Sequence, residues 1–531
     1  MWQIYGEKET CGTKGGLVSK WKQSMNLVVT TNGEKSAEVI VPRRLQTSWE
    51  GLNFRRYKLM NVTESRFKNR QLHMEDYLQM VSAEQKEYAE VSAHQRIAEN
   101  NDIITDFQTG NLMEQILHKD NLNKAYKKVK SNKGAGGVDG MSVDELLGFL
   151  KDNQEQLIQQ IKDGKYKPNP VRRVEIPKET KGEVRKLGVP TVVDRVFQQA
   201  ITQVLSPIYE KQFSENSFGF RPNRGAHDAL KQCQTNVNDG YVYVVDMDLE
   251  KFFDTVCQSK LIEVLSRTIK DGRVISLIHK YLNAGVISRG MFEKTEIGMP
   301  QGGPLSPLLS NIMLNELDKE LARRGHRFVR YADDCMIFCK SRKSAERTLN
   351  NIVPYIEGKL FLKVNRTKTC VAHISKVKYL GYSFYRHKGT CRFRVHPKSI
   401  IKMKNRIREL TDRHNGWGNE YRALKLTQFI RGWVNYFGMA DMKSLLQNND
   451  KWLRHRIRAV YWKQWKKTKT KYRKLKELGM NEDFIQWHAN MRQGIWNCSN
   501  NRLVQFALNN EKLREWGYPT FTEFYLKRCE N

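Results

Sequence analysis

The stretch FVRYADDCMIFC, residues 328–339, decides the fold. An apolar run leads through a tyrosine and a small residue to two adjacent acids, Asp333 and Asp334, and a second apolar run follows. Apolar runs of this length with turn-forming residues between them predict a β-hairpin that carries both acids at its turn. A lone Asp-Asp pair is more often a solvated loop, so a functional interpretation needs a second acidic segment.

Such a segment is YVYVVDMD, residues 241–248, an apolar run that ends in Asp246 and Asp248. These two side chains share a face because successive residues of a strand point to opposite sides. If this strand lies beside the hairpin, the carboxylates meet, and like charges at short range need a counter-charge. Mg²⁺ prefers a few carboxylates together with substrate phosphates. Two such ions would support an in-line displacement at phosphorus, so the pattern favours nucleotidyl transfer.

The charge of the chain indicates a polyanionic partner. Among 531 residues, 91 Lys and Arg exceed 57 Asp and Glu, which gives a formal charge of +34. Nucleic acid is the first candidate, and a basic membrane-surface protein is the alternative. We expect no membrane span, because the longest apolar runs are far shorter than the roughly 20 residues that cross a bilayer. Nine Cys without a Cys-x-x-Cys pair, and no apolar leader at the start, favour a reducing, cytoplasmic location.

The composition changes near residue 400, beyond which eight of the eleven Trp lie. Helical patterns alternate with short apolar runs over residues 112–390, which predicts an α+β core. Beyond residue 395 apolar residues recur at three- and four-residue spacing, which predicts helices. Residues 1–105 show weak periodicity and are expected to form a peripheral extension. Whether translation starts at Met1, Met60 or Met74 is left open by the sequence.

A basic segment, Lys451 to Lys476, contains twelve Lys or Arg, no Asp or Glu, and five Trp or Tyr. This density suits contacts to phosphates with stacking on bases or riboses, although some of the aromatic residues must pack helices. We expect the following residues to bind RNA: Lys451, Arg454, Arg458, Lys463, Lys466, Lys467, Lys469, Lys471 and Arg473.

A family resemblance emerges from the order of several motifs. RRVEIPK, RKLGVPTVVDR, NSFGFRPNR, GMPQGGPLSPLLSNIMLNELD, RYADD, KVNRTKT and YLGYSF occur in the order seen in bacterial group II intron reverse transcriptases. The resemblance continues through FIRGWVNYF and the basic segment, over residues 112–531. It implies a right-hand polymerase with fingers and palm at 106–390, including an antiparallel sheet with the YADD hairpin. A helical thumb at 391–455 and a maturase-specific RNA/DNA-binding domain at 456–531 would follow. Without an endonuclease-like Cys cluster near its end, the chain resembles the compact, endonuclease-free class.

The resemblance also implies metal ligands. In polymerase palms the ligand of the first strand lies five residues before a bulky aromatic, and Asp248 lies five before Phe253. This offset selects Asp248 over Asp246, which the shared face could not do. Asp333 and Asp334 would complete a set that holds two Mg²⁺ ions, for which Mn²⁺ can substitute. Phe253 would be the steric gate that excludes a ribose 2′-OH.

Further roles follow from matching positions. Lys178 and Arg185 match the fingers hairpin that faces the triphosphate, although this hairpin is one residue longer than expected. Arg221 is a weaker candidate, because it could instead pair with a structural carboxylate. Gln301, with the two glycines after it, would lie against the nascent base pair. Lys368 matches the lysine proposed to protonate pyrophosphate, and a solvated lysine is the alternative.

These features predict an RNA-directed DNA polymerase that is encoded by a bacterial group II intron. It would copy an RNA template from a DNA primer with dNTPs, and would bind intron RNA and target DNA to assist splicing and retrohoming. Three alternatives are a reverse transcriptase of phage defence or a CRISPR system, a splicing factor with an inactive palm, and an RNA-dependent RNA polymerase.

Overall fold

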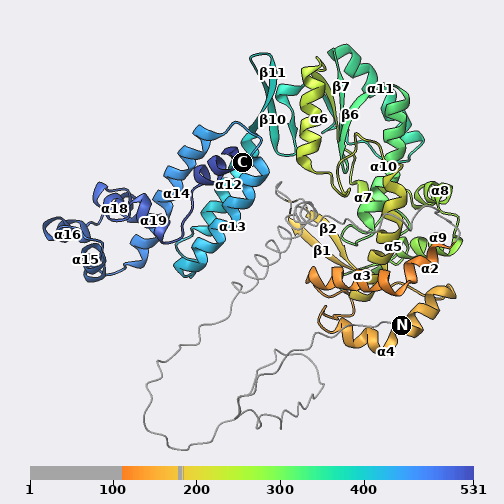
Figure 1. Ribbon diagram of the computed structural model, residues 1–531, viewed down its shortest axis with the longest axis horizontal. Helices are drawn as coiled ribbons and strands as arrows, with labels where there is room; N and C mark the ends of the chain where they lie inside the picture. Colours follow the sequence, from red (N-terminus) through yellow and green to blue (C-terminus); the bar gives the residue numbers. More distant parts are fainter. Residues whose placement is uncertain (1–110, 178–181, 183, 531) are drawn as a thin grey trace, which may run out of the picture. The chain divides into compact units, whose positions relative to one another are not determined.

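The computed structural model describes residues 111–177, 182 and 184–530. The expected extension at 1–105 and the candidate Lys178 lie outside these residues. Within them, helices and three antiparallel-rich sheets alternate up to β11 (Thr390–Val395), and helices follow to Glu530, as the sequence predicted (Figure 1). No helix among the described residues combines the length and apolar character needed to cross a bilayer.

The sheet that carries the acidic residues has the order β6-β7-β3-β8. Its strands are β6 (Arg327–Tyr331), β7 (Asp334–Cys339), β3 (Tyr243–Met247) and β8 (Cys370–His373), all paired antiparallel. β6 and β7 form the predicted hairpin, with Tyr331 opposite Asp334. β3 lies directly beside β7, with Asp246 opposite Met336, so the condition under which the acidic segments meet is fulfilled.

Side chains on the two faces of β7 enter different parts of the core, as the two-residue period of a strand requires. Cys335, Ile337 and Cys339 pack with helix α11 (Arg342–Gly358), which covers one face of the sheet. Met336 and Phe338 pack on the opposite face with α6 (Ala226–Asn238) (Figure 1). Cys335 and Cys339 are buried free thiols that serve as small core residues.

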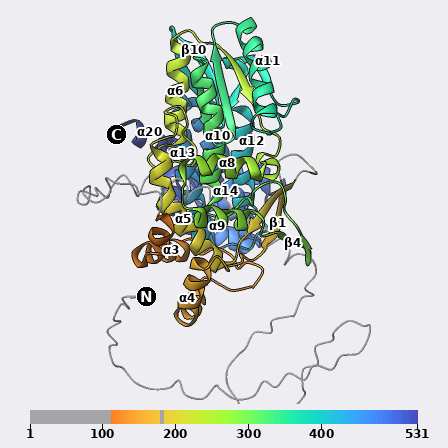
Figure 2. The ribbon, with the colours of Figure 1, turned by 90° about the vertical axis from the view of Figure 1, so that its right-hand side faces the viewer.

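A second sheet has the order β2-β1-β4-β5 and consists of β1 (Val171–Pro177), β2 (Val184–Val189), β4 (Val286–Ser288) and β5 (Met291–Glu293). The helices before the third sheet include α5 (Val192–Glu210), against which α2 (Leu112–Leu117) and α3 (Lys119–Ser131) pack; Figure 2 shows α3 beside α5. Besides α6 and α11, the remaining helices of this part are α4 (Leu146–Lys162), α7 (Phe252–Thr255), α8 (Gln258–Thr268), α9 (Gly272–Leu282) and α10 (Ser306–Arg323).

The third sheet, of order β11-β10-β9, leads into the helical part of the chain. It contains β9 (Lys378–Tyr379), β10 (Tyr382–His387) and β11, and the short helix η1 (Ile374–Lys376) precedes it. The helices that follow are α12 (Pro397–Leu410), α13 (Asn419–Phe437), α14 (Lys443–Gln464), α15 (Thr468–Glu477), α16 (Glu482–Ala489), α17 (Ile495–Ser499), α18 (Arg502–Ala507), α19 (Asn510–Glu515) and α20 (Phe521–Glu530).

The expected end of the thumb falls inside a continuous helix. The sequence placed the end of the thumb at 455, but α14 continues without a break from Lys443 to Gln464. Its buried residues on both sides of that point, Leu453 and Ile457, belong to one hydrophobic core. The division between thumb and maturase domain therefore remains a prediction, and α14 is shared by the two ranges.

Candidate active site and nucleic-acid interface

Four carboxylates gather where β3 ends and the β6–β7 hairpin turns. Asp246 lies within β3, Asp248 directly follows that strand, Asp333 lies in the turn and Asp334 begins β7. Burial and then the charge of Asp248 raise the pKa of Asp246 to about 6. Desolvation, with the charges of Asp333, Asp246 and Asp248, raises the pKa of Asp334 to about 7, although part of its side chain meets solvent. The structure thus concentrates negative charge at this edge of the sheet.

Asp333 connects this cluster to two arginines. Burial raises the pKa of Asp333 and the nearby charge of Asp248 raises it further, whereas the charges of Arg185 and Arg330 lower it. Arg185, an exposed residue of β2, therefore lies within electrostatic range of Asp333. Among the residues the structure describes, no three His, Cys, Asp or Glu side chains are already converged as a metal-binding group.

Asp248 is held by the segment that follows α11. Its Oδ2 accepts a 2.8 Å hydrogen bond from Nδ2 of Asn365, and Nζ of Lys368 lies 3.7 Å from the same oxygen. The backbone N–H of Asn365 also donates to the carbonyl oxygen of Asp248 at 2.9 Å. Lys368 thus lies beside a catalytic candidate, and its role as a proton donor remains a prediction. Asn365 was missed by the sequence reasoning, although it lies in the motif KVNRTKT from which Lys368 was selected.

The two phenylalanines of α7 differ in exposure. Phe252 is 2% exposed and Phe253 is partly exposed, and their rings meet edge to face with centroids 5.3 Å apart. The backbone N–H of Met299 donates to the carbonyl of Phe253 at 2.7 Å. Phe252 is therefore the core residue, whereas part of the Phe253 ring remains available to a ligand.

The loop that contains Gln301 is joined to the strand that carries Arg185. The carbonyl of Gln301 accepts a 2.8 Å hydrogen bond from the N–H of Gly188 in β2. A Cβ at Gly302, whose φ is +124°, would lie 2.8 Å from the Gly188 carbonyl oxygen, and one at Gly303 would lie 2.4 Å from a side-chain oxygen of Gln198. Side chains at these two positions would therefore collide with the protein itself, and the proposed contact of this loop with the nascent base pair remains a prediction.

Arg221 also needs correction as a nucleotide-binding candidate. The residue is only 7% exposed, and its guanidinium makes three hydrogen bonds of 2.7–3.1 Å to the carboxylate of Glu210. It also donates to the carbonyls of Ser214 and Ser217 at 2.6 and 2.9 Å. The alternative left open by the sequence, a structural ion pair, is the one observed.

Two of the residues expected to bind RNA are buried in the fold instead. Arg454, 3% exposed, donates to the carbonyl of Tyr518 at 3.0 Å. Arg458, 7% exposed, donates to the carbonyl of Leu508 at 2.8 Å and to Asn510 at 3.1 Å. Both attach the C-terminal segment to α14. The sequence analysis included these two arginines because of their charge, since the density of basic residues does not show which side chains face the protein interior.

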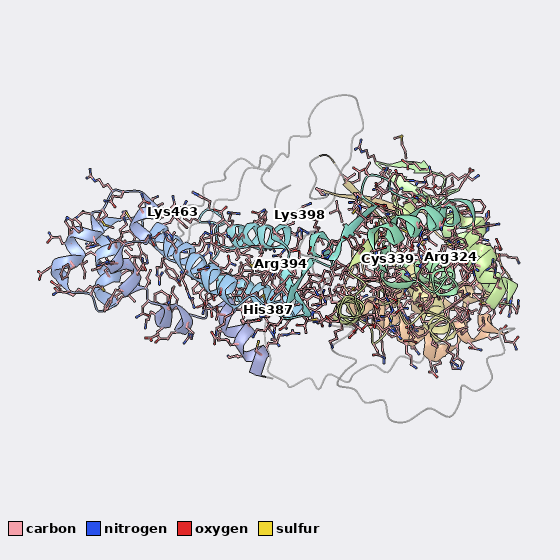
Figure 3. All side chains as sticks on the ribbon, turned by 90° about the horizontal axis from the view of Figure 1, so that it is seen from above. Arg324, Cys339, His387, Arg394, Lys398 and Lys463 are labelled. Atoms are coloured by element: carbon pink, nitrogen blue, oxygen red, sulfur yellow. The ribbon has the colours of Figure 1, made fainter. Side chains whose placement is uncertain are left out.

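The other basic candidates remain accessible. Lys463 lies near the end of α14 (Figure 3), and Lys471 places its ammonium group 4.7 Å from the ring centroid of Trp462. The exposed members of the set are Lys451, Lys463, Lys466, Lys467, Lys469 and Arg473. The buried aromatic residues of this segment, which pack helices, are Tyr461, Trp462 and Trp465.

Comparison with known proteins identifies two families in this chain. The family described as reverse transcriptase (RNA-dependent DNA polymerase) matches residues 176–384. The family described as group II intron, maturase-specific domain matches residues 400–479. These ranges contain the carboxylate cluster and the whole basic segment, respectively.

Individual relatives agree with these matches. The group II intron-encoded protein LtrA of Lactococcus lactis subsp. cremoris is 31% identical over 382 residues, which cover 60% of this chain and 62% of LtrA. Protein YkfC of Escherichia coli (strain K12) is 33% identical over 317 residues, which cover 52% of this chain and 82% of YkfC. A solved structure, a partial Cas6-RT-Cas1–Cas2 complex, aligns with a TM-score of 0.31 and 24% identity over 47% of this chain and 43% of that chain.

Both domain types occur in the order expected from the motifs, and the matched relatives include an intron-encoded protein. The chain therefore belongs to the family of bacterial group II intron reverse transcriptases with a maturase domain.

Proposed function

We propose that this protein is an RNA-directed DNA polymerase that copies an RNA template from a DNA primer with dNTPs. The single observation that carries the proposal is that the end of β3, with Asp248, lies beside the β6–β7 hairpin, with Asp333 and Asp334, in the part of the chain that matches the reverse transcriptase family. Carboxylate oxygens at this position suit divalent cations, and the exposed Arg185 of β2 supplies a positive charge for phosphates.

We further propose that Asp248, Asp333 and Asp334 bind divalent cations, namely two Mg²⁺ ions for which Mn²⁺ can substitute. The residues fit this role because their oxygens are the ligands that Mg²⁺ prefers, and because their mutual repulsion would be relieved by a cation. When bound, such ions supply activation of the attacking hydroxyl and stabilisation of the leaving pyrophosphate.

The remaining residues of the site take supporting roles in this proposal. Arg185 and Lys178 attract the triphosphate, and Gln301 lies on the loop joined to the Arg185 strand. Lys368, whose exposed amino group lies 3.7 Å from the Asp248 carboxylate, donates a proton to the leaving pyrophosphate. The partly exposed ring of Phe253 excludes the 2′-OH of a ribonucleotide.

The helical half is proposed to bind intron RNA and target DNA, and so to assist splicing and retrohoming in the bacterial cytoplasm. Its support is the match to the maturase-specific domain and the exposed cations near the end of α14. The chain spans 62% of the length of LtrA, so the activity of the whole protein is part of this proposal.

Primer extension tests the proposal. The purified protein is given an RNA template, a DNA primer and Mg²⁺, with dNTPs or rNTPs in parallel reactions, and the Asp333→Ala variant serves as control. Extension with dNTPs alone that disappears in the variant supports the proposal. A folded protein that binds RNA but extends no primer would contradict the polymerase assignment and favour a splicing factor.

A further inference from the structure

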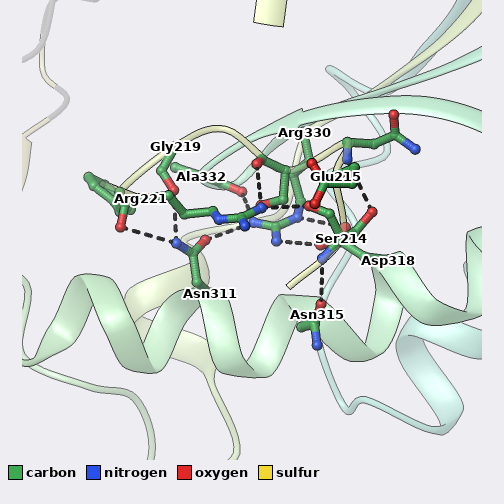
Figure 4. Close-up of polar contacts among 12 residues, drawn as sticks. Ser214, Glu215, Gly219, Arg221, Asn311, Asn315, Asp318, Arg330 and Ala332 are labelled. Atoms are coloured by element: carbon green, nitrogen blue, oxygen red, sulfur yellow. Dashed lines mark hydrogen bonds and ion pairs between the residues drawn. The ribbon is translucent and has the colours of Figure 1, made fainter. Parts of the chain in front are cut away.

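A buried arginine lies three residues before Asp333. Arg330 of β6 is fully buried, and so is its partner Asp318 of α10. Nε of Arg330 donates to Oδ1 of Asp318 at 2.7 Å, and a second guanidinium nitrogen contacts Oδ2, so the pair is bidentate (Figure 4). Buried pairs of this kind are weak evidence for stability, because desolvation offsets much of the attraction. The remaining contacts of Arg330 indicate a different purpose.

The third guanidinium nitrogen of Arg330 reaches the catalytic turn. It donates to the carbonyl of Ala332 at 2.9 Å and to Oδ1 of Asn311 at 3.0 Å. Ala332 has a φ of +56°, a left-handed conformation that is costly for a residue with a Cβ. Such a conformation persists only where contacts with the surrounding structure hold it in place. The hydrogen bond from Arg330 is one such contact, because it fixes the position of the Ala332 carbonyl.

The turn is supported from its other side by a segment that Asn311 holds. Nδ2 of Asn311 donates to the carbonyl of Gly219 at 2.8 Å. A Cβ at Gly219 would lie only 2.3 Å from the backbone nitrogen of Ala332, so the two backbones are in close contact. The carbonyl of Arg330 also accepts a 2.9 Å bond from the N–H of Phe218. The turn is thus enclosed by the guanidinium and by the Gly219 backbone.

We propose that Arg330, oriented by Asp318 and Asn311, is a positioning residue that fixes the Ala332–Asp333 turn in the conformation required for nucleotidyl transfer. The inference rests on the proposed polymerase function. Arginine suits the task because its planar fork can bind a carboxylate and still donate elsewhere, whereas a lysine ammonium cannot reproduce that geometry. The guanidinium is fully buried, so Arg330 acts through the position of Asp333 rather than by touching substrate.

The experiment compares Arg330→Lys and Asn311→Ala with a matched control, Arg422→Lys. Arg422 is also a buried arginine, 2% exposed. Its hydrogen bonds go to Asn419, Asn415 and the carbonyl of Asp412, none of which belongs to the β6-β7-β3-β8 sheet. Thermal unfolding, RNA affinity and single-turnover primer extension over a range of dNTP concentrations are measured for each protein. Asn311→Ala keeps the test decisive should Arg330→Lys fail to fold.

We expect Arg330→Lys and Asn311→Ala to lower the maximal rate by about tenfold or more, because small displacements of catalytic groups are costly. The half-saturating dNTP concentration and the RNA affinity should change little, and Arg422→Lys should lose stability but keep its maximal rate. A folded Arg330→Lys or Asn311→Ala protein with the maximal rate of wild type would overturn the inference alone. A wild-type protein without extension would overturn the polymerase function and the inference with it.

Discussion

Asn365 and Asp248 are 117 residues apart in sequence, and a 2.8 Å hydrogen bond joins Nδ2 of the first to Oδ2 of the second. The side-chain oxygen of the same asparagine accepts from the N–H groups of Thr367 and Lys368 at 3.2 and 3.3 Å. One residue therefore links a candidate metal ligand to the turn that presents a candidate proton donor. The local turn explains why an asparagine occurs here, and the contact to Asp248 gives it a function.

Replacing Asn365 by Ala should slow primer extension by about tenfold to a hundredfold, since hydrogen bonds to charged groups contribute roughly 1.5–3 kcal/mol. Single-turnover extension at saturating dNTP measures the effect. Asn365→Asp should be at least as damaging, because it places a carboxylate against Asp248. Unchanged rates in both variants would show that Asp248 needs no such support.

Replacing Phe253 by Ala should raise the incorporation of ribonucleotides relative to dNTPs, because the proposed gate is removed. The neighbouring Phe252→Ala variant is the matched control. It should destabilise the protein by about 3–5 kcal/mol, as truncation of a buried phenylalanine does, without changing sugar selectivity. Competition between ATP and dATP in primer extension gives the ratio. Equal selectivity in wild type and Phe253→Ala would remove Phe253 as the gate.

A methyl group at Gly219 should displace the catalytic turn, because its Cβ would lie 2.3 Å from the nitrogen of Ala332. We expect Gly219→Ala to lose both stability and extension activity. Gly148→Ala is the control: this glycine lies in α4 with open space around its Cβ position. There alanine should stabilise the protein by roughly 0.5–1 kcal/mol through helix propensity. Thermal unfolding and extension rates distinguish the two, and an active, stable Gly219→Ala protein would refute the close packing.

The exposed lysines and the buried arginines of the basic segment should respond differently to substitution. Lys466→Ala with Lys467→Ala should flatten the dependence of log affinity on log salt by roughly 0.7–0.9 for each phosphate that no longer meets a lysine. Arg454→Met should instead lower the thermal midpoint, since it leaves the Tyr518 carbonyl without its donor. RNA binding at several salt concentrations and thermal unfolding test both expectations. If the salt dependence of RNA affinity changed only in Arg454→Met, then Arg454 rather than Lys466 and Lys467 would contact the RNA phosphates, contrary to our assignment.

The hairpin and its neighbouring strand could be predicted from the sequence because their signals are local. Apolar runs, a turn between them and the two-residue period are all present within a dozen residues. The sequence pattern left open whether β3 lies beside β7, and the observed strand pairing shows that it does. The metal and nucleotide roles of the site residues remain predictions.

What the sequence could not provide are contacts between distant segments. Nothing in the sequence near Arg454 indicates that the carbonyl of Tyr518 accepts a hydrogen bond from it. The sequence analysis therefore placed all the basic residues of this segment on one RNA-binding surface. Arg330 and Asn311 were likewise invisible as a pair, because their relationship exists only once α10 packs against β6. Patterns of charge and polarity show which residues are present, whereas tertiary packing decides which way each of them faces.

The central claim is that polymerisation takes place at the carboxylates of the hairpin, separately from RNA binding. Asp248→Asn and Asp333→Asn preserve the shape of each side chain while removing its charge, so each variant should fold. The decisive measurement is primer extension on an RNA template beside RNA affinity for the same preparations. We predict that extension falls by about 10²–10³ or more in each variant, on the scale seen when one group that stabilises a transition state is removed, with affinity nearly unchanged. Extension at the wild-type rate in either variant would contradict the account.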